Sequence, residues 1–171
     1  GIRILSEELN IHLDPGPGAL IYSLEAGLDS QKLDGIIVSH SHIDHTNDTA
    51  VLIEAMTHGG TRKHGFLAAS HSVLYGNEIC DKAISNYHLN LPENIIEAKA
   101  GEIFSAGNVN IKVCKAEHSD PETVGFRFET RNCSGISMAL RSRFLCVYLN
   151  VRTHKMSDKI RFVLQILLRF V

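Results

Sequence analysis

Short apolar runs broken by polar turns make up the first part of the chain. Leu9–Leu13 is rich in apolar residues and stops at Asp14–Gly18, where two prolines and two glycines prevent a strand or helix from continuing. The run Ile36–Val38 shows no polar alternation, which is typical of a strand buried on both faces. Apolar residues then recur at helical spacing over 50–56, and Gly59-Gly60 closes that stretch. The pattern predicts a strand, a tight loop, a buried strand, a polar loop and a helix.

Beyond this helix, apolar content and alternation predict four more strand segments, which are Phe66–Ala69, Val73–Tyr75, Asn110–Ala116 and Val124–Thr130. The segment Glu102–Ala106 lies just before the third of these, across Gly107-Asn108, and this arrangement predicts a β-hairpin. The pattern of Ala83–Leu91 is compatible with either strand or helix.

The buried strand runs directly into a histidine-rich motif, His40-Ser41-His42-Ile43-Asp44-His45. Side chains alternate in an extended segment, so His40, His42 and Asp44 point to one side, and the turn into the following helix can bring His45 towards them. Imidazole nitrogen and carboxylate oxygen are common zinc ligands and also suit manganese or iron, whereas magnesium and calcium prefer oxygen. A plain polar loop explains any single histidine, but a chance H-x-H-x-D-H is expected on the order of once in a thousand such chains. The motif predicts a metal site, with zinc as the first choice.

The composition fits one globular domain, and acidic and basic residues are distributed unevenly along it. The chain has 171 residues, 44% of them hydrophobic, and a formal net charge of -2, which gives no general attraction to nucleic acid or acidic membranes. Residues 132–171 contain seven bases and one acid, a balance of +6, whereas residues 1–131 contain ten bases and 18 acids, a balance of -8. Such a step marks either a basic partner-binding face or a segment foreign to the rest. We therefore separate a core at 1–131 from a divergent basic C-terminal segment of the same domain at 132–171.

The sequence shows no feature typical of an oxidising compartment or a membrane. Cys80, Cys114, Cys133 and Cys146 have no C-x-x-C spacing, and no secretory apolar segment precedes them. The apolar stretch Phe162–Leu168 is far shorter than the roughly 20 residues that a membrane-spanning helix needs, and it is interpreted as a core helix or strand. We expect a cytoplasmic protein with no membrane partner.

Three separated motifs together resemble those of the metallo-β-lactamase superfamily, namely Asp14-Pro15-Gly16, His40–His45 at a strand end, and His118 followed by Ser119-Asp120-Pro121. The segments that look most like the ribonuclease Z-related branch of prokaryotic hydrolases are Leu13–Leu20, Asp44–Asp48 and Val51–Met56. The resemblance covers about Ile2–Thr130. It implies an α/β fold, an αββα sandwich of two mixed β-sheets flanked by helices, incomplete or divergent at the C-terminus, with the metals at one edge.

The resemblance also implies the metal ligands. His40, His42 and His118 would bind a first zinc ion, and Asp44 and His45 would bind a second, so that the chain holds one or two ions. A lone histidine such as His118 is more often a surface residue than a ligand. The Asp-Pro turn that follows it, however, can place it at the same edge as the other loops.

Two aspartates are expected to support these ligands. Asp14 would stabilise the histidine loop by hydrogen bonding, and its alternative role is that of a simple turn-former. Asp120 would be a partner of His118, or else part of an ordinary Asp-Pro turn.

By the same resemblance, the chain would be a hydrolase that uses a metal-bound hydroxide, with Asp44 orienting the hydroxide and accepting its proton. The resemblance favours a phosphodiester, RNA-like substrate, and a thioester or lactam is the alternative. A catalytically impaired metal-binding or RNA-binding module of the same fold is a further hypothesis, and a structural zinc domain is another. We expect a small-molecule or nucleic-acid substrate, with a homodimer as the oligomer to test.

The sequence departs from the family pattern after Thr130. The family supplies a metal-bridging aspartate some twenty residues after the third histidine, but Ser137–Arg143 contains no carboxylate. His154 would stand for the last metal-binding histidine, or else is an exposed residue. Either the C-terminal segment is divergent, frameshifted or incompletely represented, or the protein has given up its second metal. We therefore expect one tight site, a weak second site and low turnover.

Overall fold

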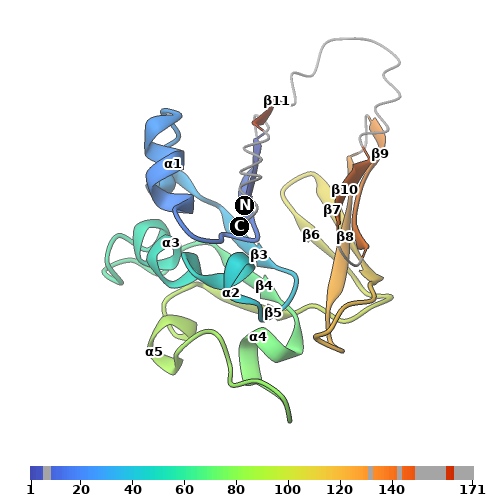
Figure 1. Cartoon of the computed structure of the whole chain (residues 1–171). Coiled ribbons are helices and arrows are strands. Elements are labelled where there is room, and N and C mark those ends of the chain that lie inside the picture. The colour runs from blue at the N-terminus through green and yellow to red at the C-terminus, as the bar shows by residue number, and fades with distance from the viewer. Residues whose placement is uncertain (6–8, 131–132, 142–143, 149–160, 164–171) are drawn as a thin grey trace.

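Two β-sheets facing each other form the body of the protein, and helices lie outside the first sheet (Figure 1). The computed structural model describes residues 1–5, 9–130, 133–141, 144–148 and 161–163. The two sheets and their helices confirm the predicted α/β sandwich.

The first sheet is mixed. Its strands are β1 (Ile2–Leu5), β2 (Asn10–Leu13), β3 (Gly35–Val38), β4 (Phe66–Ala69), β5 (Asn94–Glu97) and β11 (Arg161–Val163). They follow the order β11-β1-β2-β3-β4-β5. Strands β2 to β5 run parallel, and β1 is antiparallel to both of its neighbours. The parallel strands therefore end at one common edge.

The second sheet is antiparallel throughout, whereas the resemblance implied a mixed sheet. Its strands are β6 (Ile103–Ala106), β7 (Val109–Lys115), β8 (Val124–Thr130), β9 (Cys133–Arg141) and β10 (Phe144–Tyr148). Their order, β10-β9-β8-β7-β6, is the reverse of the chain order, because each strand pairs with the next one along the chain.

Short helices connect the parallel strands. They are α1 (Ala19–Glu25), the 3-10 turn η1 (Ser30–Lys32), α2 (Ile43–Thr46), α3 (Thr49–Met56), α4 (His71–Tyr75) and α5 (Asn86–Leu89). Parallel neighbours need such crossovers, whereas consecutive antiparallel strands such as β6 and β7 can be joined by a short turn.

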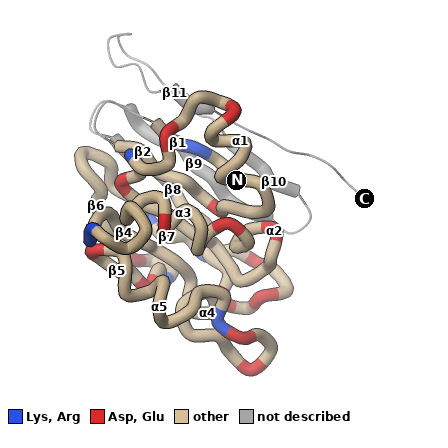
Figure 2. The backbone as a smooth tube through the Cα atoms, turned by 90° about the vertical axis from the view of Figure 1, so that its left-hand side faces the viewer, with Lys and Arg blue, Asp and Glu red and all other residues tan. Residues whose placement is uncertain are grey.

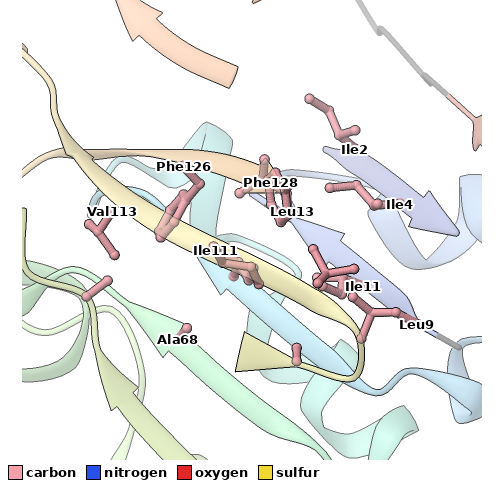
Figure 3. Close-up of a cluster of buried hydrophobic side chains, with 14 of the residues drawn as sticks. Ile2, Ile4, Leu9, Ile11, Leu13, Ala68, Ile111, Val113, Phe126 and Phe128 are labelled. Carbon is pink, nitrogen blue, oxygen red and sulfur yellow. The ribbon is translucent and has the colours of Figure 1, made fainter. Parts of the chain in front are cut away.

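Two apolar clusters hold these layers together. Ile37 of β3 packs between the sheets with Ile111 and Phe126 of the second sheet, and Figure 3 shows part of this cluster. Ile36 and Val38 point the other way and pack with α3. All of these side chains are at most 1% exposed. Because β3 is covered on both faces, its run is apolar at every position, as the sequence pattern predicted.

Most of the strong local patterns are confirmed. The strands predicted from Leu9–Leu13, Phe66–Ala69 and Val124–Thr130 are β2, β4 and β8, and the predicted hairpin is β6 and β7. The helix expected over 50–56 is α3. Of the apolar stretch 162–168, the first two residues belong to β11, which pairs with β1. The rest lies outside the described residues.

The strand predicted at Val73–Tyr75 is wrong, because these residues belong to α4. Strand β4 already ends at Ala69, and Val73 and Leu74 turn into the cluster on the helix side of the sheet. A run of three apolar residues fits a buried helical turn as well as a strand. The ambiguous stretch 83–91 contains the short helix α5.

No helix in the described ranges is long and apolar enough to cross a membrane.

A buried histidine stands on the helix side of β2. His12 is the register partner of Arg3 on β1, and it is 4% exposed. Neither of its ring nitrogens has a hydrogen-bond partner among the described residues. Burial, and then the nearby positive charge of Arg3, lowers the pKa of His12 to about 3. His12 is therefore neutral in the folded protein.

The buried neutral His12 predicts a loss of stability in acid. Its folded pKa lies below the unfolded value of about 6.5, so protonation favours the unfolded chain. Its contribution is complete above pH 6.5 and is lost as the pH falls towards 3, at up to about 1.4 kcal/mol per pH unit. Urea unfolding between pH 7 and 4.5 should show a shallower pH dependence for His12→Leu than for wild type. The control His64→Leu should keep the wild-type slope, and equal slopes for all three proteins would contradict this role of His12.

Candidate metal centre

The histidine motif lies at the carboxyl edge of the first sheet. Strand β3 ends at Val38, and residues 39–42 form the loop into α2. Asp14 follows directly after the parallel neighbour β2, and its N–H donates to the Ile37 carbonyl at 2.8 Å. Two motifs that are separate in the sequence thus meet because their strands are adjacent and parallel.

Four imidazole rings gather at this edge. The ring centroid of His40 lies 4.7 Å from that of His42, 4.1 Å from that of His45 and 4.4 Å from that of His118. The rings of His42 and His118 are 4.6 Å apart. His118 comes from the connection between β7 and β8, so the site joins both sheets. One nitrogen each from His40, His42 and His118 lies within 4.8 Å of the others.

His40 is the buried member of this group. It is 1% exposed, and burial is the first cause that lowers its pKa to about 4, followed by the neighbouring His45. Its Nδ1 lies 2.9 Å from the Ser39 hydroxyl, whereas its buried Nε2 has no hydrogen-bond partner among the described residues. A buried, unpartnered nitrogen is costly in a folded protein, and a bound cation would satisfy it.

The imidazoles of the other two candidate ligands, His42 and His118, are partly exposed. Burial lowers the pKa of His118, and the neighbouring His42 and His45 lower it further. A neutral imidazole has a free lone pair for a metal. Three imidazoles, one of which has a buried unpartnered nitrogen, fit a divalent cation, and zinc commonly takes this ligand set.

Asp14 anchors the start of the histidine loop through hydrogen bonds to Ser39. Its Oδ1 accepts the Ser39 N–H at 2.7 Å, and its Oδ2 accepts the Ser39 hydroxyl at 2.9 Å. Because Ser39 also contacts the His40 ring, the carboxylate fixes His40 through one intervening side chain. Burial raises the pKa of Asp14, but contacts with His45 and Ser39 outweigh this and lower it. A simple turn-former would not need this set of contacts.

His45 lies between two carboxylates. Its Nδ1 is 3.0 Å from Asp14 Oδ2, and its Nε2 is 3.3 Å from Asp44 Oδ2. Burial lowers the pKa of His45, but these acids outweigh it and raise the pKa. The side chain of Asp44 on α2 is 72% exposed. The structure thus places both residues beside the three-histidine group, and their role as ligands of a second metal stays a prediction.

The glycine-rich loop after β2 fits closely under α2. A Cβ atom on Gly16 would lie 1.8 Å from the Asp44 carbonyl oxygen. The Asp48 N–H donates to the Pro15 carbonyl at 2.8 Å, and the Asp48 carboxylate accepts the Leu20 N–H of α1 at 3.1 Å. Asp48 directly precedes α3, but its side chain makes no cap hydrogen bond to that helix and instead ties α1 to the segment that follows the histidine motif.

Asp120 connects the third histidine to the motif. It is 1% exposed, and its Oδ2 accepts the Ser41 N–H at 3.0 Å and the Ser41 hydroxyl at 2.8 Å. The same oxygen accepts the Ser72 hydroxyl at 2.6 Å. Burial raises the pKa of Asp120, but these hydrogen bonds lower it overall. Asp120 thus does more than form a turn, although none of its hydrogen bonds among the described residues reaches the His118 ring.

Sequence reasoning missed the serines of this network. Ser39 could have been suspected, because it lies between the buried strand and His40. Ser72 carries no comparable signal, because it follows a strand that supplies none of the four gathered rings.

The structure describes only part of the C-terminal segment in which further metal ligands were sought. His154 lies outside the described residues. Residues 137–141, where the bridging aspartate was sought, belong to β9 and contain no carboxylate.

Comparisons with known proteins show the family of the chain. A family model described as the beta-lactamase superfamily domain matches residues 9–149. An uncharacterized protein of Methanocaldococcus jannaschii is 34% identical over 130 residues, which cover 76% of this chain and 49% of that protein. Ribonuclease Z of Methanopyrus kandleri is 28% identical over 138 residues, which cover 79% and 45%.

Solved structures show the same fold at low sequence identity. The metallo-beta-lactamase fold protein YhfI of Bacillus subtilis matches with a TM-score of 0.56 and 20% identity, over 74% of this chain and 49% of that one. The MIM-2 metallo-beta-lactamase matches with a TM-score of 0.53 and 17% identity, over 80% and 52%. The chain thus spans about half the length of the relatives it matches.

The close fit of the glycine loop predicts a steric cost at Gly16. Because the new Cβ of Gly16→Ala meets backbone, the loop or α2 must move, and we expect a loss of about 3 kcal/mol in the free energy of unfolding. Gly27→Ala is the control, because Gly27 has a φ of 70° but nothing within 4 Å of its Cβ direction. Its loss should be about 1 kcal/mol. Urea unfolding of the metal-free proteins measures both, and similar losses would argue against the steric fit.

Proposed function

Because the chain belongs to the beta-lactamase superfamily, we propose that it acts as a zinc-dependent hydrolase. The observation that carries the proposal is the gathering of His40, His42 and His118 around a buried imidazole nitrogen with no protein partner. Zinc fits this donor set because it binds imidazole readily and leaves a coordination position for water or substrate when three protein ligands hold it.

The residues of this edge have distinct roles in the proposal. His40, His42 and His118 hold the ion, which when bound lowers the pKa of water and polarises the scissile bond. Asp14 and Ser39 keep the His40 ring in place. The exposed Asp44 carboxylate beside His45 accepts a proton from the attacking water.

The proposed substrate is a phosphodiester. Support comes from the ribonuclease Z of Methanopyrus kandleri among the relatives. Figure 2 shows acidic positions at and beside α2, so this part of the described surface does not itself attract phosphate. The attraction for an anionic diester would come from the bound cation, which is the largest local positive charge in such a site. Likeness to metallo-beta-lactamase structures is a matter of fold and does not favour a lactam.

A metal-binding or RNA-binding module without catalysis is the second candidate. It is favoured by the absence of a carboxylate from residues 137–143, where the family places its bridging aspartate. Without that aspartate a second metal would be held weakly, and the clamp that two metals place on the attacking and leaving oxygens would be lost.

Metal content and cleavage test the two candidates together. Wild-type protein should bind about one zinc ion and cleave a chromogenic phosphodiester, and chelation should abolish the cleavage. His42→Ala should weaken zinc binding at least about tenfold because it removes a ligand, whereas His64→Ala, outside the ring cluster, should match wild type.

The outcomes separate the alternatives. Zinc-loaded protein that cleaves no diester, thioester or lactam would contradict the hydrolase. Salt-dependent RNA binding without cleavage would then support the binding module. Protein that binds neither zinc nor RNA would contradict both.

A further inference from the structure

The β4–α4 turn, defined here as Ser70–Ser72 and thus including the first residues of α4, lies against the metal centre but contributes none of its gathered rings. Ser72, in the first turn of α4, is fully buried, and its hydroxyl donates to Asp120 Oδ2 at 2.6 Å. The Ser70 hydroxyl, also buried, lies 3.0 Å from that of Ser72. A buried hydroxyl aimed at a buried carboxylate is a specific contact, because either group would be costly without the other.

Asp120 joins three separate segments of the chain. Its Oδ2 accepts two hydrogen bonds from Ser41, in the histidine motif, and one from Ser72, in the β4–α4 turn. Its Oδ1 accepts the Glu122 N–H of its own turn at 3.0 Å. All four donors use the ionised carboxylate, whose two oxygens have about four acceptor sites.

The histidines of the centre depend on different supports. His40 is fixed from below by Ser39, which Asp14 holds. His118 lies in the connection between the sheets, two residues before Asp120. The far end of this connection is held where the Val124 N–H donates to the Ser39 carbonyl at 3.1 Å. At the His118 end, Asp120 accepts hydrogen bonds from Ser41 of the histidine motif, and the Ser119 hydroxyl lies 3.3 Å from His118 Nδ1 and 3.4 Å from His42 Nε2.

We propose that Ser72, acting through Asp120, positions His118 for metal binding, so that a turn without ligands sets part of the metal affinity. The inference rests on the proposed function, because it requires zinc at His40, His42 and His118. Ser72 and Asp120 are positioning residues in this account, and neither touches the ion.

The junction, by which we mean the hydrogen bonds of Ser41 and Ser72 to Asp120, indicates which substitutions test the role of the Ser72 hydroxyl. Ser72→Ala removes one of three donors on Oδ2 and frees the carboxylate to turn away from the motif. Ser72→Thr keeps the hydroxyl. Ser23→Ala is a matched control, because Ser23 is a buried serine on α1 whose hydroxyl donates to the Ala19 carbonyl at 2.7 Å, far along the chain from the junction.

Zinc affinity in the full chain tests the proposal. By competition with a chromogenic chelator, Ser72→Ala should bind zinc about tenfold more weakly than wild type, as is typical when a partner of a metal ligand is lost. Ser72→Thr and Ser23→Ala should stay within about twofold. The visible absorption of the cobalt-substituted protein should change in Ser72→Ala alone, because the cobalt bands report the ligand geometry.

A metal-free readout tests the junction itself. The Ser41 amide donates to Asp120, so its hydrogen exchange in the apo protein should be faster in Ser72→Ala and unchanged in Ser23→Ala. Unchanged exchange, or wild-type zinc affinity with an unchanged cobalt spectrum in Ser72→Ala, would overturn the inference. Wild-type protein that binds no zinc would instead overturn the proposed function on which it rests.

Discussion

The buried carboxylate of Asp14 and its two hydrogen bonds to Ser39 are the contacts on which the centre depends. The chain arrives from β2, enters a loop that only a glycine fits at position 16, and leaves Asp14 under the end of β3. The carboxylate fixes Ser39, and Ser39 fixes the His40 ring. Burying the His40 ring with one nitrogen unpartnered is costly. The hydrogen bonds of Asp14 and Ser39 help to offset that cost.

The two sheets add the rest of the centre from separate directions. The first sheet contributes the motif through the parallel order β2-β3-β4, which brings the loops after these strands to one edge. The second sheet contributes His118 from the connection between β7 and β8. The layers are held by the apolar cluster around Ile37, Ile111 and Phe126. Packing between the sheets therefore sets the distance between ligands that come from different sheets.

Sequence patterns predicted the parts of this arrangement that are local. The unbroken apolar run of β3 and the helical spacing of α3 reflect burial within one element, so they were visible in the chain. The half-exposed β5 and the helical turn at Val73 depend on distant partners, and they were missed or misassigned. The contact of Ser72 with Asp120 spans 48 residues, and no local pattern encodes it. The histidines were found because their residue types are rare in combination, while the serines that hold them are ordinary.

The nature of the ligands is the central claim, and zinc K-edge X-ray absorption on the zinc-loaded chain tests it most directly. The account predicts about three imidazole nitrogens at roughly 2.0–2.1 Å, with the remaining position taken by oxygen. A sulfur shell at roughly 2.3 Å, or oxygen scatterers without the imidazole pattern, would contradict the account.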